Sequence, residues 1–319
     1  IRKPLPVSLI GACACLLASG CSQGANPGDE VHPVPPPRLL YPDLHERDPS
    51  RKAYSMTENA AGDLRVWTEE TRDGTDLVQS VKTENGQWSE PEVLDWPKIV
   101  SNVNPAFSAY DDRLYFASDR PLPDAPERDD MNIWSVAWEG DSWGEASPIP
   151  GDVNTTADET DIAMAADGTA YFVSKHPRGL GGRDIARANL NAETSDWEYE
   201  ALPDTISSRF VESHVSITPD GKTLIFYSRV RPIIGGVDLK IAELQDDGSW
   251  LGPFTLGKNI NSTANEFGSG LSLNGDWFFF SRNGHLLEMP MADFRLEIDL
   301  AREAFANNQE RRFLGLSDK

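Results

Sequence analysis

The segment Ser216–Arg229, which reads SITPDGKTLIFYSR, decides the fold class of this 319-residue chain. Its corner Pro219-Asp220-Gly221 predicts a tight turn, because proline presets φ while aspartate and glycine tolerate the positive φ of a hairpin. Beyond the corner, apolar residues occupy both alternating faces of Leu224–Tyr227. A strand that is apolar on both faces is typical of one covered by neighbouring sheets.

Two more turn signals divide the residues that follow this hairpin. The glycine corner Gly235–Leu239 leads into a third predicted strand, which ends at Leu244, and Asp247–Trp250 leads into a fourth. Short runs of this kind, separated by tight turns, predict strands that pair in antiparallel order. Residues 212–250 are therefore expected to form one four-stranded sheet.

The same unit recurs along the chain. The serine that ends the second strand recurs with steps of 56, 54 and 53 residues, and the fourth-strand tryptophan recurs with steps of 55, 54 and 53. The two series are Ser118, Ser174, Ser228 and Ser281, and Trp88, Trp143, Trp197 and Trp250. A fixed period near fifty, with about four strands per period, predicts a β-propeller whose blades bury their faces against one another.

Five copies of the unit can be counted, although the first is degenerate and the fifth has no fourth-strand tryptophan. We therefore expect an all-β propeller over residues 46–299, with five blades rather than six. One end of the chain should complete the blade begun by the other, since an open ring would leave an unpaired strand edge. Leu296–Leu300 and the segment before residue 54 are both candidates for this strand. Residues 300–319 have helical composition and are expected to lie outside the ring.

These copies resemble the WD-like propeller repeat of TolB and of many exported bacterial proteins. The resemblance is carried by Thr218–Gly221, Leu224–Phe226 and Gly235–Leu239, and by Leu114–Arg120 in the second copy. It covers roughly residues 46–295. What it implies is a fold, because one fold hosts many functions.

The first residues indicate export. Arg2 and Lys3 precede an apolar stretch, Val7–Ala18, and this pattern predicts a signal segment over residues 1–21. Leu17–Cys21 resembles the lipobox of bacterial lipoproteins, although alanine stands where that family prefers leucine. The resemblance implies that Cys21 is lipidated; a plain cleaved signal peptide is the alternative.

The residues after the signal predict where the protein is held. By the same resemblance, Ser22 implies the outer membrane of a Gram-negative cell, on its periplasmic side. Residues 22–45 are rich in proline and glycine and should form an extended tether. We therefore expect contact with a membrane only through the N-terminal lipid.

Composition excludes several classes of partner and site. The formal net charge is −22, which argues against free nucleic acid, because phosphate contacts need lysine and arginine. All three cysteines lie in the first 21 residues, so the folded part is predicted to have no disulfide. The five histidines are not at zinc-ligand spacing, and no catalytic sequence motif occurs. We expect no cofactor and no metal, and we expect a monomer.

Acidic residues recur where the innermost strands of three successive copies begin. Together with one histidine, the candidate binding residues are Glu159, Asp161, Glu212, His214 and Glu266. Innermost strands line the central channel of a propeller, so these side chains could converge at one rim and bind a cation or a substrate. Alternatively, glutamate at this repeat position hydrogen-bonds the adjacent blade and holds the ring together. A further expectation is that Arg120 and Arg282 pair with Asp184 and Asp238, the acids of the Gly-Gly-x-Asp corners.

Two functions fit these patterns best. The first is a non-enzymatic, lipid-anchored scaffold that binds an envelope protein or glycan through the channel rim and three long loops, Pro121–Asp130, Lys175–Arg183 and Val230–Gly236. The alternative is a propeller-type glycosidase that uses the carboxylates of Asp161, Glu212 and Glu266, assisted by His214. Such carboxylates must lie within about 10 Å of each other. A propeller stabilised by a bound cation is a third hypothesis.

Overall fold

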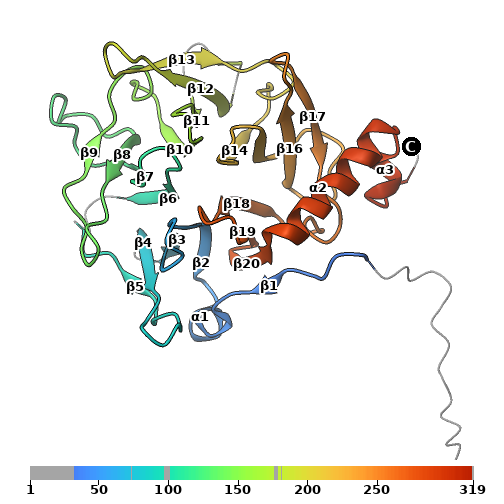
Figure 1. Cartoon of the computed structure of the whole chain (residues 1–319), viewed down its shortest axis with the longest axis horizontal. Helices are drawn as coiled ribbons and strands as arrows, with labels where there is room; N and C mark the ends of the chain where they lie inside the picture. The colour runs from blue at the N-terminus through green and yellow to red at the C-terminus, as the bar shows by residue number, and fades with distance from the viewer. Residues whose placement is uncertain (1–31, 73, 97–100, 176–178, 181, 318–319) are drawn as a thin grey trace, which may run out of the picture. The chain divides into compact units, whose positions relative to one another are not determined.

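The computed structural model describes residues 32–72, 74–96, 101–175, 179–180 and 182–317, and Val34–Lys319 form one compact unit. In that unit, five antiparallel sheets of four strands each surround a central axis (Figure 1). The prediction of an all-β propeller with five blades is confirmed. The expected signal segment, Cys21 and residues 22–31 of the expected tether lie outside the described residues.

Each blade runs from an innermost strand to an outermost one. Blade 1 consists of β2 (Lys52–Glu58), β3 (Leu64–Thr71), β4 (Gly74–Val81) and β5 (Glu92–Val93). Blade 2 consists of β6 (Asn102–Phe107), β7 (Leu114–Ser118), β8 (Asn132–Val136) and β9 (Ser147–Pro148). Blade 3 consists of β10 (Glu159–Met164), β11 (Ala170–Ser174), β12 (Asp184–Leu190) and β13 (Trp197–Ala201).

The last two blades follow the same order. Blade 4 consists of β14 (Glu212–Ile217), β15 (Thr223–Ser228), β16 (Asp238–Leu244) and β17 (Trp250–Thr255). Blade 5 consists of β18 (Glu266–Leu271), β19 (Trp277–Arg282) and β20 (His285–Pro290), with β1 (Arg38–Leu39) as its outermost strand.

The ring is closed by β1, so the segment before residue 54 supplies the closing strand. Arg38 pairs with Glu288 and Leu39 with Leu287 of β20. The expectation of an extended tether up to residue 45 is wrong for its last part, because residues 38–39 belong to blade 5 and the short helix α1 (Pro42–Arg47) leads from them to β2. Leu296–Leu300, the other candidate for the closing strand, is helical.

Buried charges reinforce this closure. The Glu288 carboxylate has no exposed surface and pairs with Arg38 of β1 and, at 3.3 Å, with Arg65 of blade 1. Arg65 also pairs with Glu58 at 2.7 Å and lies over the ring of Trp88. A buried ion pair is costly to break, because the partner left behind is an uncompensated charge. The network therefore ties the first blade to the last.

The second strands are buried on both faces, as their sequence pattern predicts. All five residues of β7 and all five of β11 are buried, and the rings of Phe116, Phe172, Phe226 and Phe279 are fully buried. These rings fill the space between neighbouring blades. The turn-rich sequence supplies the short connections that this packing needs.

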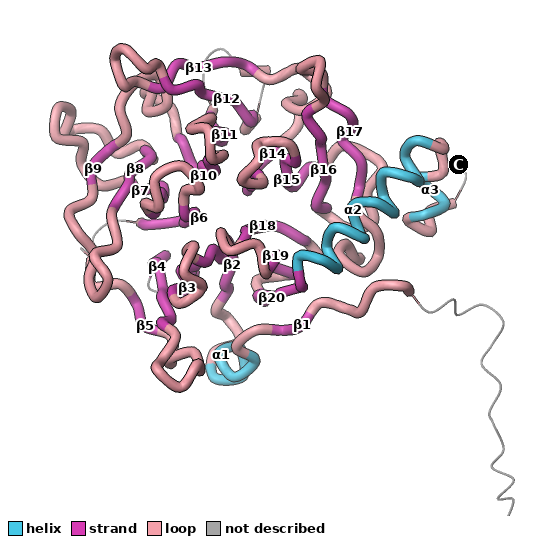
Figure 2. The backbone as a smooth tube through the Cα atoms, in the orientation of Figure 1, coloured by secondary structure: helices cyan, strands magenta, loops and turns pink. Residues whose placement is uncertain are grey.

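Two helices lie on the outside of the ring after the last strand (Figure 2). Helix α2 (Met291–Ala306) begins directly after β20, before the start expected at residue 300, and α3 (Glu310–Phe313) follows it. Phe294 of α2 stacks on Phe278 with ring centroids 3.6 Å apart. Glu310 accepts a hydrogen bond from the backbone N–H of Thr255 at 2.7 Å, so α3 satisfies a group at the edge of β17. Within the described residues, no helix has the length and apolar character that crossing a bilayer requires.

Candidate functional site

All five innermost strands carry a register irregularity near their start. A bulge places two consecutive side chains on the same side of a strand and bends that strand. Four of the bulges contain a residue with positive φ, namely Ser55, Asn104, His214 and Gly268. Asp161 holds the corresponding place in blade 3. These positions define one level of the channel, which Ser55, Asn104, Asp161 and His214 line.

Hydrogen bonds join the blades at this level. Ser55 Oγ donates to Asn104 Oδ1 at 2.9 Å, and Asn104 Nδ2 donates to the carbonyl oxygen of Thr160 at 2.7 Å. Ser213 Oγ donates to Asp161 Oδ2 at 3.0 Å, which joins blade 4 to blade 3.

The circuit continues through blade 5. Ser269 Oγ donates to the carbonyl oxygen of His214 at 2.9 Å, and Thr57 Oγ1 of blade 1 donates to the carbonyl oxygen of Leu271 at 3.4 Å. Every junction between neighbouring blades is thus crossed by at least one hydrogen bond. A network in which buried polar groups are paired fixes the position of its members, so the side chains around the axis are pre-organised.

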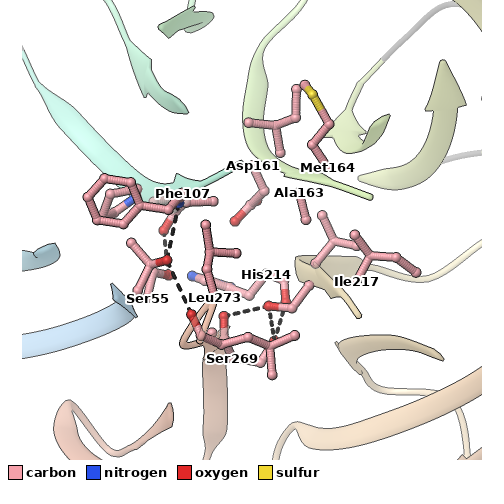
Figure 3. Close-up of a pocket in the computed structure, with 18 residues that line it drawn as sticks. Ser55, Phe107, Asp161, Ala163, Met164, His214, Ile217, Ser269 and Leu273 are labelled. Carbon is pink, nitrogen blue, oxygen red and sulfur yellow. Dashed lines mark hydrogen bonds between the residues drawn. The ribbon is translucent and has the colours of Figure 1, made fainter. Parts of the chain in front are cut away.

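The channel itself is narrow. Its cavity of about 40 Å³ is lined by apolar side chains such as Phe107 and Met164 and by the polar residues Ser55, Asp161, His214 and Ser269, which come from different blades (Figure 3). One water molecule needs roughly 10–15 Å³ measured in this way, so the channel holds a few waters. Pockets for organic ligands are typically about 300–1,000 Å³, so this channel does not admit a sugar ring.

A larger cavity of about 400 Å³ lies at the mouth of the channel and shares Asn104 and His214 with it. The mouth is on the side where the innermost strands begin. Because neighbouring strands are antiparallel, the loops between second and third strands and the linkers between blades emerge on this same side. The mouth cavity is lined by Lys52, Tyr54, Glu70, Thr75, Ser101, Val103, Asn104, Met131, Thr160, Arg183, His214 and Phe267.

His214 lies at the centre of an aromatic cluster. Its ring centroid is 5.7 Å from that of Tyr54, 5.4 Å from Phe267 and 5.3 Å from Tyr227. Its Nδ1 atom is buried and has no hydrogen-bond partner among the described residues. Burial lowers the pKa of His214, the Asp161 charge opposes this shift, and Arg183 adds to it. The imidazole is therefore neutral at pH 7 and can donate or accept a hydrogen bond.

The three glutamates of the expected site lie elsewhere. Glu159, Glu212 and Glu266 have no exposed surface, and none of them lines the channel or the mouth cavity. Each carboxylate accepts hydrogen bonds from the backbone N–H and the hydroxyl of the residue four positions earlier, in the linker that enters its blade. The N–H distances are 2.9 Å from Thr155, 2.9 Å from Ser208 and 3.1 Å from Ser262.

Each glutamate also bonds the second strand of its own blade. Glu159 accepts from Ser174 Oγ at 2.7 Å, and Glu212 accepts from Ser228 Oγ at 3.0 Å. Glu266 pairs with Arg282 at 2.9 Å. Burial raises the pKa of Glu159 to about 7, against the lowering effect of its hydrogen bonds, and burial also raises the pKa of Glu212. These carboxylates fasten each linker to the blade that follows it.

The expected pairing of Arg120 and Arg282 with the corner aspartates is wrong. Arg282 pairs with Glu266, and Arg120 donates to Asn102 Oδ1 at 2.7 Å. Each aspartate instead accepts hydrogen bonds from backbone N–H groups of its own corner. Asp184 accepts from the backbone N–H of Leu180 at 2.8 Å, and Asp238 accepts from those of Ile234 at 2.5 Å and Gly235 at 3.0 Å.

Of the five residues expected at the site, only Asp161 and His214 line the channel. The mouth cavity is also lined by Tyr54, Arg183 and Phe267, which the sequence analysis did not identify. Tyr54 and Phe267 directly precede the bulge residues Ser55 and Gly268. Their position within the repeat was the available signal. Among the residues that the structure describes, no group of three or more histidine, cysteine, aspartate or glutamate side chains is placed to hold a metal ion.

No protein-family model matches the chain, and no curated protein matches its sequence. Several solved structures have a similar fold. A gluconolactonase from Xanthomonas campestris is 14% identical over 82% of this chain and 98% of its own, with a TM-score of 0.45. TolB from Acinetobacter baumannii is 12% identical over 75% of this chain and 54% of its own, with a TM-score of 0.43.

A puromycin-hydrolyzing peptidase from Mycobacterium tuberculosis is 17% identical over 63% of this chain, with a TM-score of 0.41. The chain spans 28% of that peptidase and about half of TolB. Such likeness concerns the fold alone. The chain is a five-bladed β-propeller with TolB among its structural neighbours.

Proposed function

We propose that this protein is a non-enzymatic glycan-binding propeller of the bacterial envelope and that a saccharide binds in the mouth cavity. The observation that carries the proposal is the lining of this cavity of about 400 Å³, where the rings of Tyr54 and Phe267 lie beside hydrogen-bonding side chains. Small-ligand sites combine such a volume with aromatic walls and a few placed polar groups. A sugar ring has an apolar face and a rim of hydroxyl groups, and it would meet both kinds of surface here.

The state of the carboxylates favours binding over hydrolysis. A glycosidase needs two carboxyl groups on either side of the bond that it cleaves. Of Asp161, Glu212 and Glu266, only Asp161 lines the channel, and the other two are fully buried and occupied by hydrogen bonds. A catalytic pair at the mouth would require these glutamates to leave their linkers.

The shape of the site favours a glycan over a protein partner. The mouth cavity is a recess around the propeller axis, enclosed by residues from blades 1, 2, 3, 4 and 5. A recess of this size suits one or two sugar units, whereas a protein interface of standard size is a broad patch of about 800 Å² on each partner.

Localisation in the envelope rests on the sequence. The basic and apolar residues 1–18 and the lipobox-like segment Leu17–Cys21 support export and lipidation of Cys21. The glycine- and proline-containing residues 22–33 support a spacer between the lipid and the ring, whose core begins at the buried Val34. In this proposal the propeller stands off the periplasmic face of the outer membrane.

The proposal is tested by binding of the full chain to a panel of envelope oligosaccharides. We expect wild-type protein to retain at least one glycan, and we expect Phe267→Ala to weaken retention by about tenfold, because an aromatic stacking surface is lost. The matched control is Tyr110→Ala, which removes an exposed ring outside the cavity. A panel in which no saccharide binds, or equal binding by wild type and Phe267→Ala, would refute the proposal; capture of a protein instead would favour the scaffold alternative.

A further inference from the structure

Arg183 stands out among the residues of the mouth cavity. Its side chain is half-buried and lines the cavity, and its guanidinium has no hydrogen bond or ion pair with any residue that the structure describes. Its backbone is held in place, because its carbonyl oxygen accepts a hydrogen bond from the N–H of Glu212 at 3.1 Å. A partly desolvated charge is costly unless it is paired. The guanidinium is therefore free to pair with an anion that enters the cavity.

Arg183 has no carboxylate partner among the described residues, although the protein is strongly acidic. The chain has 51 acidic and 29 basic residues, so carboxylates are abundant. Several other partly buried arginines pair with a carboxylate: Arg51 with Glu69, Arg65 with Glu58, Arg128 with Asp130, Arg187 with Glu200 and Arg282 with Glu266. Each of these arginines has a carboxylate partner, whereas Arg183 has none among the residues that the structure describes.

The acids closest to the mouth are already engaged. Asp158 pairs with Lys175 at 2.6 Å, and Glu70 pairs with Lys52 at 2.8 Å. Asp161 Oδ2 accepts hydrogen bonds from Ser213 and from Thr160, both at 3.0 Å. None of these carboxylates forms an ion pair with Arg183, so the anion that completes this arginine must come with the ligand.

We propose that the glycan bound at the mouth is acidic, and that its sugar carboxylate pairs with Arg183 while its ring lies against Tyr54 and Phe267. The inference rests on the proposed glycan-binding function and names the ligand class of the same site. The planar guanidinium matches a carboxylate with two parallel hydrogen bonds. A single vacant cation suits a singly charged carboxylate better than a doubly charged phosphate, since Lys52 is held by Glu70.

The test uses the full chain and matched ligands. The probes are oligosaccharides that contain glucuronate or galacturonate, each compared with its neutral, carboxyl-reduced form, in a titration followed by ligand-observed NMR. We expect wild-type protein to bind the acidic form of a pair about tenfold to a hundredfold more tightly, the range for a charge-assisted hydrogen bond. Arg183→Gln should weaken binding of the acidic form far more than binding of the neutral form, so that the preference is lost.

Two further variants separate charge from geometry. Arg183→Lys keeps the charge and loses the planar fork, so we expect an intermediate affinity for the acidic form. Arg295→Gln removes one positive charge from the exposed face of α2, outside the cavity, and should leave both affinities at the wild-type value.

Each remaining outcome decides against a stated part of the argument. If the wild type binds the neutral forms with equal or higher affinity, the inference of an acidic ligand is refuted, while the proposed glycan-binding function is retained. Equal loss of both forms in a folded Arg183→Gln protein would also overturn it, as would tighter binding of a sugar phosphate. If no saccharide of either kind binds, the proposed function fails together with the inference.

Discussion

Replacement of Glu212 by alanine probes how much the buried glutamates stabilise the ring. The Glu212 carboxylate accepts from Ser208 N–H at 2.9 Å, from Ser208 Oγ at 2.9 Å and from Ser228 Oγ at 3.0 Å. Its removal leaves one backbone donor and two hydroxyl donors without their acceptor. An unsatisfied buried donor costs about 1–3 kcal/mol.

The expected loss for Glu212→Ala is smaller than the sum of three such costs. The two hydroxyl groups can rotate, and removal of the carboxylate also removes the desolvation that raises the pKa of Glu212. We therefore expect the free energy of unfolding to fall by about 2–4 kcal/mol. For a domain of this size that corresponds to a decrease in Tm of roughly 3–7 °C.

The assay is thermal and urea-induced unfolding followed by circular dichroism, with two comparison variants. Glu212→Gln keeps an acceptor for Ser208 N–H and should lose less stability than the alanine variant. Glu198→Ala removes an exposed carboxylate of β13 and should change stability by no more than about 0.5 kcal/mol. If Glu212→Ala is as stable as Glu198→Ala, the carboxylate does not fasten the linker and the reasoning fails.

Three further predictions concern closure, pH and the anchor. Arg65→Met should lower the free energy of unfolding by about 3–5 kcal/mol in urea titrations, because Glu58 is left buried without its partner, and unchanged stability would contradict this. Burial raises the pKa of Glu159 to about 7 from 4.5, so the folded state binds this proton more tightly than the unfolded state does. The protonated carboxyl therefore contributes to the free energy of unfolding below about pH 4.5, and this contribution is lost as the pH rises to 7. Glu159→Gln should therefore flatten the fall in unfolding free energy over that interval, and an unaltered pH profile would refute the assignment. Cys21→Ser should abolish incorporation of labelled palmitate in bacterial cells, and persistent labelling would exclude lipidation at this residue.

The blades could be predicted from sequence because their signals are local. The Pro219-Asp220-Gly221 corner, the two-sided apolar strand after it and the repeat of Trp250 at earlier copies each depend on a few neighbouring residues. Ring closure is harder to predict, since β1 has only two residues, Arg38 and Leu39, and its partner lies in the last blade. A two-residue strand has no periodicity to detect.

The residues that line the mouth cavity could not be predicted from the sequence for a different reason. Strand alternation assumes a regular register, but β2 and β18 are irregular directly after Tyr54 and Phe267, so alternation alone does not predict that these two rings line the mouth cavity. Glu212, which bonds its linker, and Asp161, which lines the channel, are both acids near the start of an innermost strand. The repeat separates them, because Glu212 is equivalent to Glu159 and Asp161 lies two positions later, at the place of His214.

Because β1 closes the ring by pairing with β20, the propeller can complete its folding only after the last blade has been made. Arg38 and Glu288 are 250 positions apart, so the strand made first has no partner until the last blade has been synthesised. Bringing such distant segments together carries the entropic cost of a very long loop, and contacts of this kind slow folding. Until then blade 5 is incomplete, and the edge of β20 is open to other strands. A chaperone that shields this edge would act on the last blade rather than on the first four.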